Sequence, residues 1–262
     1  MSAVMALWLA APAAVPVLAQ EADTFSPARA DHYAPVTSWP DFTGVWNPDW
    51  SFLFGRNGRV PARPVLTPEA QAEYNAFLER QARDGVDQFL QVNCIPPGMP
   101  GIMRQPYPIE FLFSPGRVTI FAETYSQARR IYVDAQRDLP AEPDPLFNGT
   151  SVGYWQGDML VVDTVGFNPF VTYLAGVTPS ENMRIHEHFW LESDDLLWLE
   201  TTITDPGVLA RPFVQRLAYR RQPDWEIREY VCSENNRLIE GENGADVDLG
   251  LDEEDPFGPA VE

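Results

Sequence analysis

Several runs of the chain between residues 109 and 232 alternate apolar and polar residues with a period of two, the pattern of half-buried β-strands. Turn-forming sequences such as Ser114-Pro115-Gly116-Arg117 and Gln156-Gly157-Asp158 separate these runs. Strands that follow one another through tight turns pair as an antiparallel meander, and closing the sheet removes its exposed edges. The pattern therefore predicts a mainly β chain that forms a barrel or a strongly curved sheet.

About ten strands are expected, over residues 43–47, 109–113, 118–123, 128–134, 151–155, 159–165, 183–192, 196–204, 213–221 and 226–232. One helix is expected over residues 67–85, with Thr67 as its N-cap, Pro68 in the first turn and Gly85 at its end. Its apolar residues recur at helical spacing and would pack one face on the sheet. These elements together predict a lipocalin-like barrel with one flanking helix.

The first nineteen residues have the pattern of a signal peptide. Residues 2–19 are uncharged and apolar, and Val17-Leu18-Ala19 before Gln20 is typical of a cleavage site. Two prolines interrupt this segment, which is also short for a membrane span. We therefore expect an exported protein, periplasmic or secreted, with no membrane span after processing. An irregular lead-in over residues 20–38 and a single β-rich domain over residues 39–238 would follow.

Acidic residues dominate the charge, with 18 Lys+Arg against 38 Asp+Glu and a formal net charge of −20. This balance argues against nucleic acid and anionic membrane surfaces as partners, because both require a cationic surface. Residues 239–262 are acidic and contain no basic residue, so we expect a disordered tail. A calcium-binding or partner-binding role is the alternative to a merely solvated tail, although the acids lack the spacing of an EF-hand loop.

Cys94 and Cys232 are the only cysteines. An even number of cysteines in an exported protein predicts a disulfide, which would tie the proline-rich segment after Cys94 to the last expected strand. Neither cysteine lies in a CxxC motif or beside a histidine, so a reactive thiol has no local support. A nucleophilic thiol and a pair of buried thiols remain the alternatives.

A set of motifs is spread over residues 39–237, and they are PDFTGVW (40–46), CIPPGMP (94–100), YPIEF (107–111), SPGRV (114–118), FNG (147–149), GDMLVVDTVGF (157–167), RPF (211–213) and YVCSENNR (230–237). Through these motifs the chain resembles a large group of uncharacterised exported bacterial proteins. The resemblance implies export and a single domain, and it implies no reaction because no activity is established for the group. Related sequences often have histidine where this chain has Thr150.

Two of the three histidines, His186 and His188, lie two residues apart in one expected strand and therefore project from the same face. Imidazole titrates near neutrality, so the pair could act as a general base and its hydrogen-bond partner. The pair could instead hold a divalent metal, with a third ligand that His32, Glu110 or Glu200 would supply only through the fold. The third alternative is two solvent-facing histidines on the exterior of a barrel. No cofactor other than such a metal is expected.

Glu110 interrupts an otherwise apolar run over residues 108–113. If Glu110 shares the inner face of its strand with Leu112, its carboxylate is desolvated and suited to acid–base chemistry. The alternative places Glu110 at the start of the strand, in an ion pair with Arg104 or Arg130. Aromatic residues make up 12% of the chain, and part of them could line a pocket. The expected substrate-binding residues are Tyr107, Tyr154, Trp155, Trp198 and Arg211.

The first functional hypothesis is an exported enzyme of the lyase, isomerase or hydrolase type. It would perform acid–base chemistry on a small apolar or aromatic molecule in a barrel pocket, with His186 and His188 as base and partner and Glu110 as acid. The second hypothesis is a non-catalytic, lipocalin-like binding protein for a small hydrophobic ligand, and the third is an interaction protein that uses its acidic tail. The sequence contains no GxGxxG, P-loop, GxSxG, HExxH or SxxK motif, so nucleotide cofactors and serine-hydrolase chemistry have no support.

Overall fold

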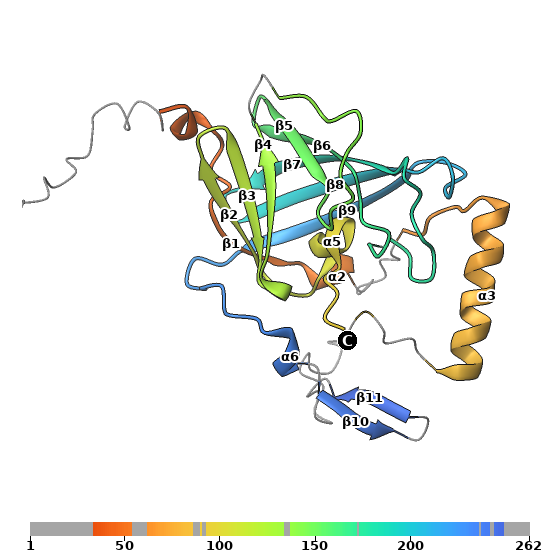
Figure 1. Cartoon of the computed structure of the whole chain (residues 1–262). Helices are drawn as coiled ribbons and strands as arrows, with labels where there is room; N and C mark the ends of the chain where they lie inside the picture. The colour runs from red at the N-terminus through yellow and green to blue at the C-terminus, as the bar shows by residue number, and fades with distance from the viewer. Residues whose placement is uncertain are drawn as a thin grey trace, which may run out of the picture.

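Nine strands form a closed barrel in which each strand pairs with the next along the chain and the last returns to the first (Figure 1). The barrel strands are β1 (Gly44–Pro48), β2 (Ile109–Ser114), β3 (Arg117–Ala122), β4 (Gln127–Tyr132), β5 (Thr150–Gln156), β6 (Met159–Val165), β7 (Arg184–Ser193), β8 (Leu196–Thr204) and β9 (Phe213–Arg221). Along most strands, buried residues alternate with more exposed ones, as the period-two pattern predicts. The predicted mainly β, lipocalin-like barrel is confirmed.

The computed structural model describes residues 34–53, 62–85, 90, 93–133, 137–171, 173–235, 237–241 and 244–248. The predicted signal peptide and most of the predicted lead-in lie outside these residues, as does the chain after residue 248. Within the described part of the chain, no helix is long and apolar enough to cross a membrane.

The prediction of a strand over residues 226–232 is wrong. Residues 226–231 have no regular secondary structure, and a short helix, α6 (Cys232–Asn235), follows them. Because β9 already pairs with β1, the barrel leaves no open edge to which this segment could add. Beyond α6, β10 (Arg237–Gly241) and β11 (Gly244–Asp248) form a separate two-stranded antiparallel sheet. Part of the tail expected to be disordered from residue 239 is therefore paired β-structure.

The expected long helix is confirmed as α3 (Pro68–Asp84), which stands beside the barrel (Figure 1). The Thr67 hydroxyl accepts a hydrogen bond from the Ala70 backbone N–H at 3.3 Å and caps the first turn. The helix contacts the barrel loops through Phe77, whose ring lies so close to Gly176 that a Cβ there would be 2.1 Å from it. The shorter helical segments are η1 (Ala34–Ser38), α2 (Trp50–Leu53), α5 (Gly98–Gly101), η2 (Ile102–Arg104) and η3 (Thr124–Ser126).

Side chains fill the inside of the barrel. The proline-rich segment contributes Met99, Ile102 and Met103, which belong to the same buried cluster as the inward-facing residues of the strands. The Tyr219 hydroxyl donates a hydrogen bond to the Met103 carbonyl and fixes this segment to β9. Burial raises the pKa of Tyr219, and the negative charge of Glu187 raises it further, so the phenol stays neutral.

The junction of β4 and β5, which we call the seam, is the shortest strand pairing of the barrel. These strands run parallel and pair through only two positions, Ile131 with Ser151 and Tyr132 with Val152. The neighbouring antiparallel pairs are longer, with six register positions between β3 and β4 and seven between β5 and β6. The expected antiparallel meander thus differs at this one junction, because the connection between β4 and β5 returns the chain so that the two strands run in the same direction.

A buried ion pair crosses this seam on the inside of the barrel. Arg129 on β4 donates from Nη1 to the Glu187 carboxylate on β7 at 3.0 Å, and its Nη2 bonds to the second carboxylate oxygen. The same Nη2 also reaches the hydroxyls of Ser151 on β5, at 3.4 Å, and Thr164 on β6, at 3.1 Å. The two charged side chains are only 2% and 0% exposed. One guanidinium therefore links β4 to the three strands that follow it.

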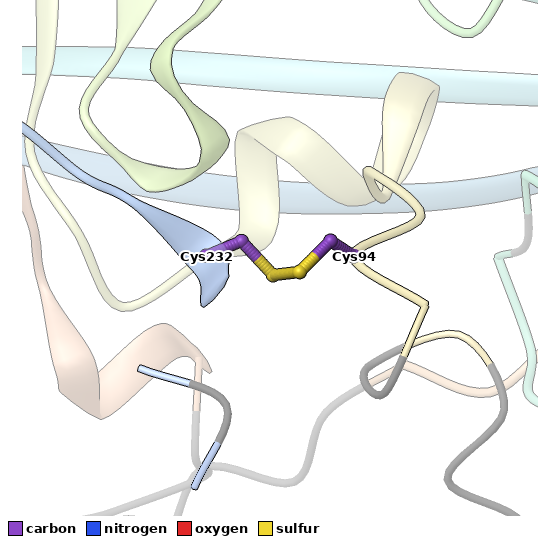
Figure 2. Close-up of a disulfide and its surroundings, with 2 residues drawn as sticks. All are labelled: Cys94 and Cys232. Carbon is purple, nitrogen blue, oxygen red and sulfur yellow. A yellow bond between two sulfur atoms is a disulfide. The ribbon is translucent and has the colours of Figure 1, made fainter. Parts of the chain in front are cut away.

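Cys94 and Cys232 form a disulfide, as the sequence predicts (Figure 2). Their sequence separation is 138 residues, so the bridge closes a loop that contains every strand from β2 to β9. It joins the start of α6 to the segment that leads into α5. The chain that leaves the closed barrel is thereby held to the segment that fills its interior.

Replacement of Glu187 by Gln should lower the free energy of unfolding by about 3–5 kcal/mol, because it leaves the Arg129 guanidinium buried without a counter-charge. Urea denaturation measures this loss. The matched control is Glu226→Gln, an exposed charge whose removal should change stability by less than about 0.5 kcal/mol. The double variant Arg129→Met/Glu187→Leu should recover much of the loss, since Ser151 and Thr164 still bond to each other at 2.8 Å. A Glu187→Gln variant as stable as the control would contradict this interpretation.

Replacement of both cysteines by serine should destabilise the protein by roughly 4–5 kcal/mol, because the unfolded chain regains the entropy that the long loop closure removes. The comparison is urea denaturation of the oxidised protein against the double variant, with the reduced wild type as a second reference. Equal midpoints for all three samples would show that the bridge does not constrain the unfolded chain.

Candidate functional site

A cleft of about 440 Å³ lies outside the barrel at the junction of β4 and β5. We call it the seam cleft, and its lining residues are Ala128, Arg130, Tyr132, Arg137, Asp144, Leu146, Phe147, Asn148, Gly149 and Thr150. One wall is the outer face of β4, and the other is the loop that leads into β5. The volume falls within the range of small-molecule sites.

Strand alternation places the first wall. Arg129 points into the barrel, so its neighbour Arg130 points outward into the cleft, followed two residues later by Tyr132. The parallel register puts Thr150 at the start of β5 beside this outward face. The inward bond of Arg129 to β7 thus also fixes where Arg130 stands.

Backbone contacts place the second wall. The Phe147 carbonyl accepts a hydrogen bond from the Met99 N–H at 2.8 Å, which holds the loop to the segment inside the barrel. Gly149 has a φ of +64°, and a Cβ there would lie 2.8 Å from the Val165 carbonyl oxygen. Only glycine therefore allows the loop to pass this close to β6.

Positive charge collects in the seam cleft although the whole chain is strongly acidic. Arg130 and Arg137 line it, and Asp144 is the one acidic side chain among its lining residues. The Arg137 guanidinium lies 3.4 Å from the centre of the Tyr132 ring, a cation–π contact. All 18 basic residues of the chain are arginines, whose planar fork suits carboxylate and phosphate groups.

Asn148, which lines the same cleft, has a side-chain hydrogen-bond acceptor without a partner. Its Oδ1 is buried, and no described residue donates a hydrogen bond to it. A buried polar atom without a partner costs about 1–3 kcal/mol, so such an atom beside a cleft is a candidate ligand contact. Phe147 and the half-exposed Leu146 supply apolar surface next to it. The arrangement suits a molecule with an anionic group, a hydrogen-bond donor and an apolar part.

A second cleft, of about 660 Å³, is a poorer candidate. It is lined by Pro40, Asp41, Asp158, Leu191, Asp194 and Arg221. Its single arginine is already committed, because the Arg221 guanidinium donates to the backbone carbonyls of Asp41, Thr43 and Asp194. These bonds fix the segment before β1 to the β7–β8 turn. The other charged residues in the lining are three aspartates, which would repel an anion.

The histidine pair, His186 and His188, shares the outer face of β7 as the alternation predicts. His186 Nδ1 lies 2.8 Å from Asp163 Oδ1 on β6, and the two Nε2 atoms lie 3.2 Å from each other. His188 Nδ1 lies 3.9 Å from Glu200 Oε1 on β8, and Arg216 on β9 donates to the same carboxylate at 2.5 Å. A continuous polar row therefore crosses four strands on the outside of the barrel.

Of the two alternatives for Glu110, the inward position is wrong. On β2 the buried residues are Ile109 and Phe111, so Glu110 points outward together with Leu112, which is 46% exposed. The residues of β2 that face the core and those that face outward both include apolar side chains. The face with Ile109 and Phe111 is the more apolar one, and it packs in the core. Around the barrel β2 lies four strands from β7, so Glu110 and the outward histidine pair face away from each other.

The structure does not bring the five expected substrate-binding residues together. Tyr107 contacts Tyr230 just before β2, Tyr154 is 54% exposed on the outer face of β5, and Arg211 is exposed before β9. Trp155 packs on Phe42 at a ring separation of 5.2 Å, and Trp198 stacks on Trp190 at 6.2 Å on the outer face of β8. None of the five lines the seam cleft.

Sequence reasoning gave no role to Arg129, Glu187 or Arg137, and it considered Arg130 only as an ion-pair partner of Glu110. The sequence does contain a signal for Arg129 and Glu187. Arg129 lies two residues before the buried Ile131 and so shares its inward face. Glu187 lies on the inward face of β7 together with Ile185 and Phe189. The FNG motif and Thr150 do line the cleft, but only the crossover brings them beside the outer face of β4.

No protein-family model matches this chain, and no curated protein matches it either. The class that fold and site define is a closed β-barrel compatible with small-molecule binding. Its function is therefore argued from the site alone.

Proposed function

We propose that this chain is an exported binding protein for a small organic anion, which it holds in the seam cleft. The observation that carries the proposal is that Arg130, Arg137 and Asn148, whose Oδ1 is buried without a partner, line one concave surface. The disulfide supports export, either to the periplasm or by secretion, because disulfides persist in oxidising compartments.

The lining indicates the chemistry of the ligand. A carboxylate would pair with the guanidinium groups, a hydroxyl or amide of the ligand would donate to Asn148, and its apolar body would lie on Leu146 and Phe147. This differs from the expected lipocalin-like site for a purely hydrophobic ligand. The inward-facing side chains fill the barrel, and the concave surface lies beside it.

The acid–base enzyme stays a prediction with less support. The Asp163–His186 contact of 2.8 Å would orient a general base, which favours that role. However, the expected acid Glu110 faces away from the histidine pair, and the expected binding residues lie apart. The residues that line the seam cleft, in contrast, already lie together.

The binding proposal is tested by calorimetric titration with 4-hydroxybenzoate, which carries a carboxylate, a ring and a hydroxyl donor. Benzamide is the neutral comparison. We expect saturable binding of 4-hydroxybenzoate, much weaker binding of benzamide, and a loss of at least about tenfold in Arg130→Gln and in Arg137→Gln, since each removes a charge-assisted hydrogen bond.

Arg211→Gln is the matched control, because it removes an exposed arginine outside the cleft and should bind like the wild type. Equal affinity for benzamide and 4-hydroxybenzoate would contradict the proposal. So would wild-type affinity in both cleft variants, or no binding at millimolar concentrations by aromatic carboxylate, sulfonate and phosphate probes.

A further inference from the structure

The histidine pair has a geometry that neither the seam cleft nor the barrel core explains. We propose that His186 and His188 form a two-histidine site for a transition-metal cation, Cu²⁺ or Zn²⁺, with solvent molecules as the remaining ligands. This site is separate from the seam cleft and does not depend on the anion-binding function.

The spacing of the two ring nitrogens is the first argument. His186 Nε2 and His188 Nε2 lie 3.2 Å apart. Two nitrogens bound at about 2.0–2.1 Å to one cation are separated by about 2.8 Å in a cis square-planar site and about 3.4 Å in a tetrahedral one. The observed separation falls between these limits, so both atoms can bind one cation with little movement.

The surroundings of the other ring nitrogens are the second argument. His186 Nδ1 lies 2.8 Å from Asp163, and His188 Nδ1 lies 3.9 Å from Glu200. Histidines that bind metals usually donate their second ring N–H to a carboxylate, which fixes the ring and directs the lone pair of the other nitrogen to the metal. Asp163 on β6 occupies that position for His186, whereas Glu200 on β8, at 3.9 Å, is too far from His188 Nδ1 to accept a hydrogen bond.

Electrostatics supply the third argument. When His186 Nδ1 carries its proton toward Asp163, His186 Nε2 presents a lone pair to His188 Nε2 at 3.2 Å. A proton on His188 Nε2 can donate to this lone pair, and a metal ion in the place of that proton would bind both nitrogens. The negative charge of Asp163 favours a positively charged occupant.

The coordination of the metal would be incomplete. In the described part of the chain, no group of three or more His, Cys, Asp or Glu residues is placed to hold a metal ion. A two-histidine site therefore leaves positions for water or for an external ligand. The side chain of His186 is 41% exposed and that of His188 is 30% exposed, so cations in solution can reach the pair. Imidazole ligands suit Cu²⁺ and Zn²⁺, and Cu²⁺ should bind more tightly than Ni²⁺.

The test is calorimetric titration of the untagged full chain with Cu²⁺, Zn²⁺ and Ni²⁺, together with electron paramagnetic resonance of the Cu²⁺ sample. We expect one ion per chain, two coordinated nitrogens in the spectrum, and loss of this binding in His186→Gln and in His188→Gln. Asp163→Asn should weaken binding by about 10–100-fold, because it removes the carboxylate that orients His186.

His32→Gln is the matched control, since it removes the third histidine and should leave affinity unchanged. Loss of binding in this control would overturn the two-histidine composition. Wild-type metal affinity in both pair variants, or no saturable binding, would overturn the site itself. Nitrogen NMR of the imidazoles distinguishes a metal ion from a proton between the two Nε2 atoms. Added Zn²⁺ should shift both Nε2 resonances. A proton that Zn²⁺ does not displace would contradict the proposal.

Discussion

The buried ion pair between Arg129 and Glu187 links the strands on the two sides of the shortest strand pairing in the barrel. Nearly every neighbouring pair of strands is joined by an antiparallel ladder, but β4 and β5 share only two register positions. Arg129 compensates for this short ladder from the inside, because its guanidinium bonds to side chains on β5, β6 and β7. Both charges are buried, so each needs the other close by. Burying either side chain without its partner would be strongly unfavourable for stability.

The same seam explains where the concave surface lies. A parallel connection has to cross from one end of the strands to the other, and here it passes over the outside of the barrel. The crossing chain supplies Asn148 and Gly149, and β4 supplies Arg130 next to the inward-facing Arg129. The interior is packed, and the seam cleft lies on the outside of the barrel, where the sheet is least regular.

The period-two pattern and the turn residues predicted the barrel strands, and the Thr67 cap predicted the helix, because these features depend on neighbours in sequence. The parallel junction could not be predicted this way, since strand order depends on contacts between distant segments. The face of Glu110 could not be decided from the sequence, because both alternating sets of residues in its strand contain apolar side chains. Arg129 and Glu187 were missed because each alone is an unfavourable core residue, and their pairing joins positions 58 residues apart.

The central claim is that the seam cleft holds a small organic anion. Its most direct test is a titration of the isotope-labelled protein with 4-hydroxybenzoate, followed by amide and side-chain NMR shifts. The account predicts saturating shifts at Arg130, Arg137 and Asn148, with no comparable change at Leu191 and Arg221 in the second cleft. Shifts confined to the second cleft or to the inward-facing residues of the barrel would contradict it.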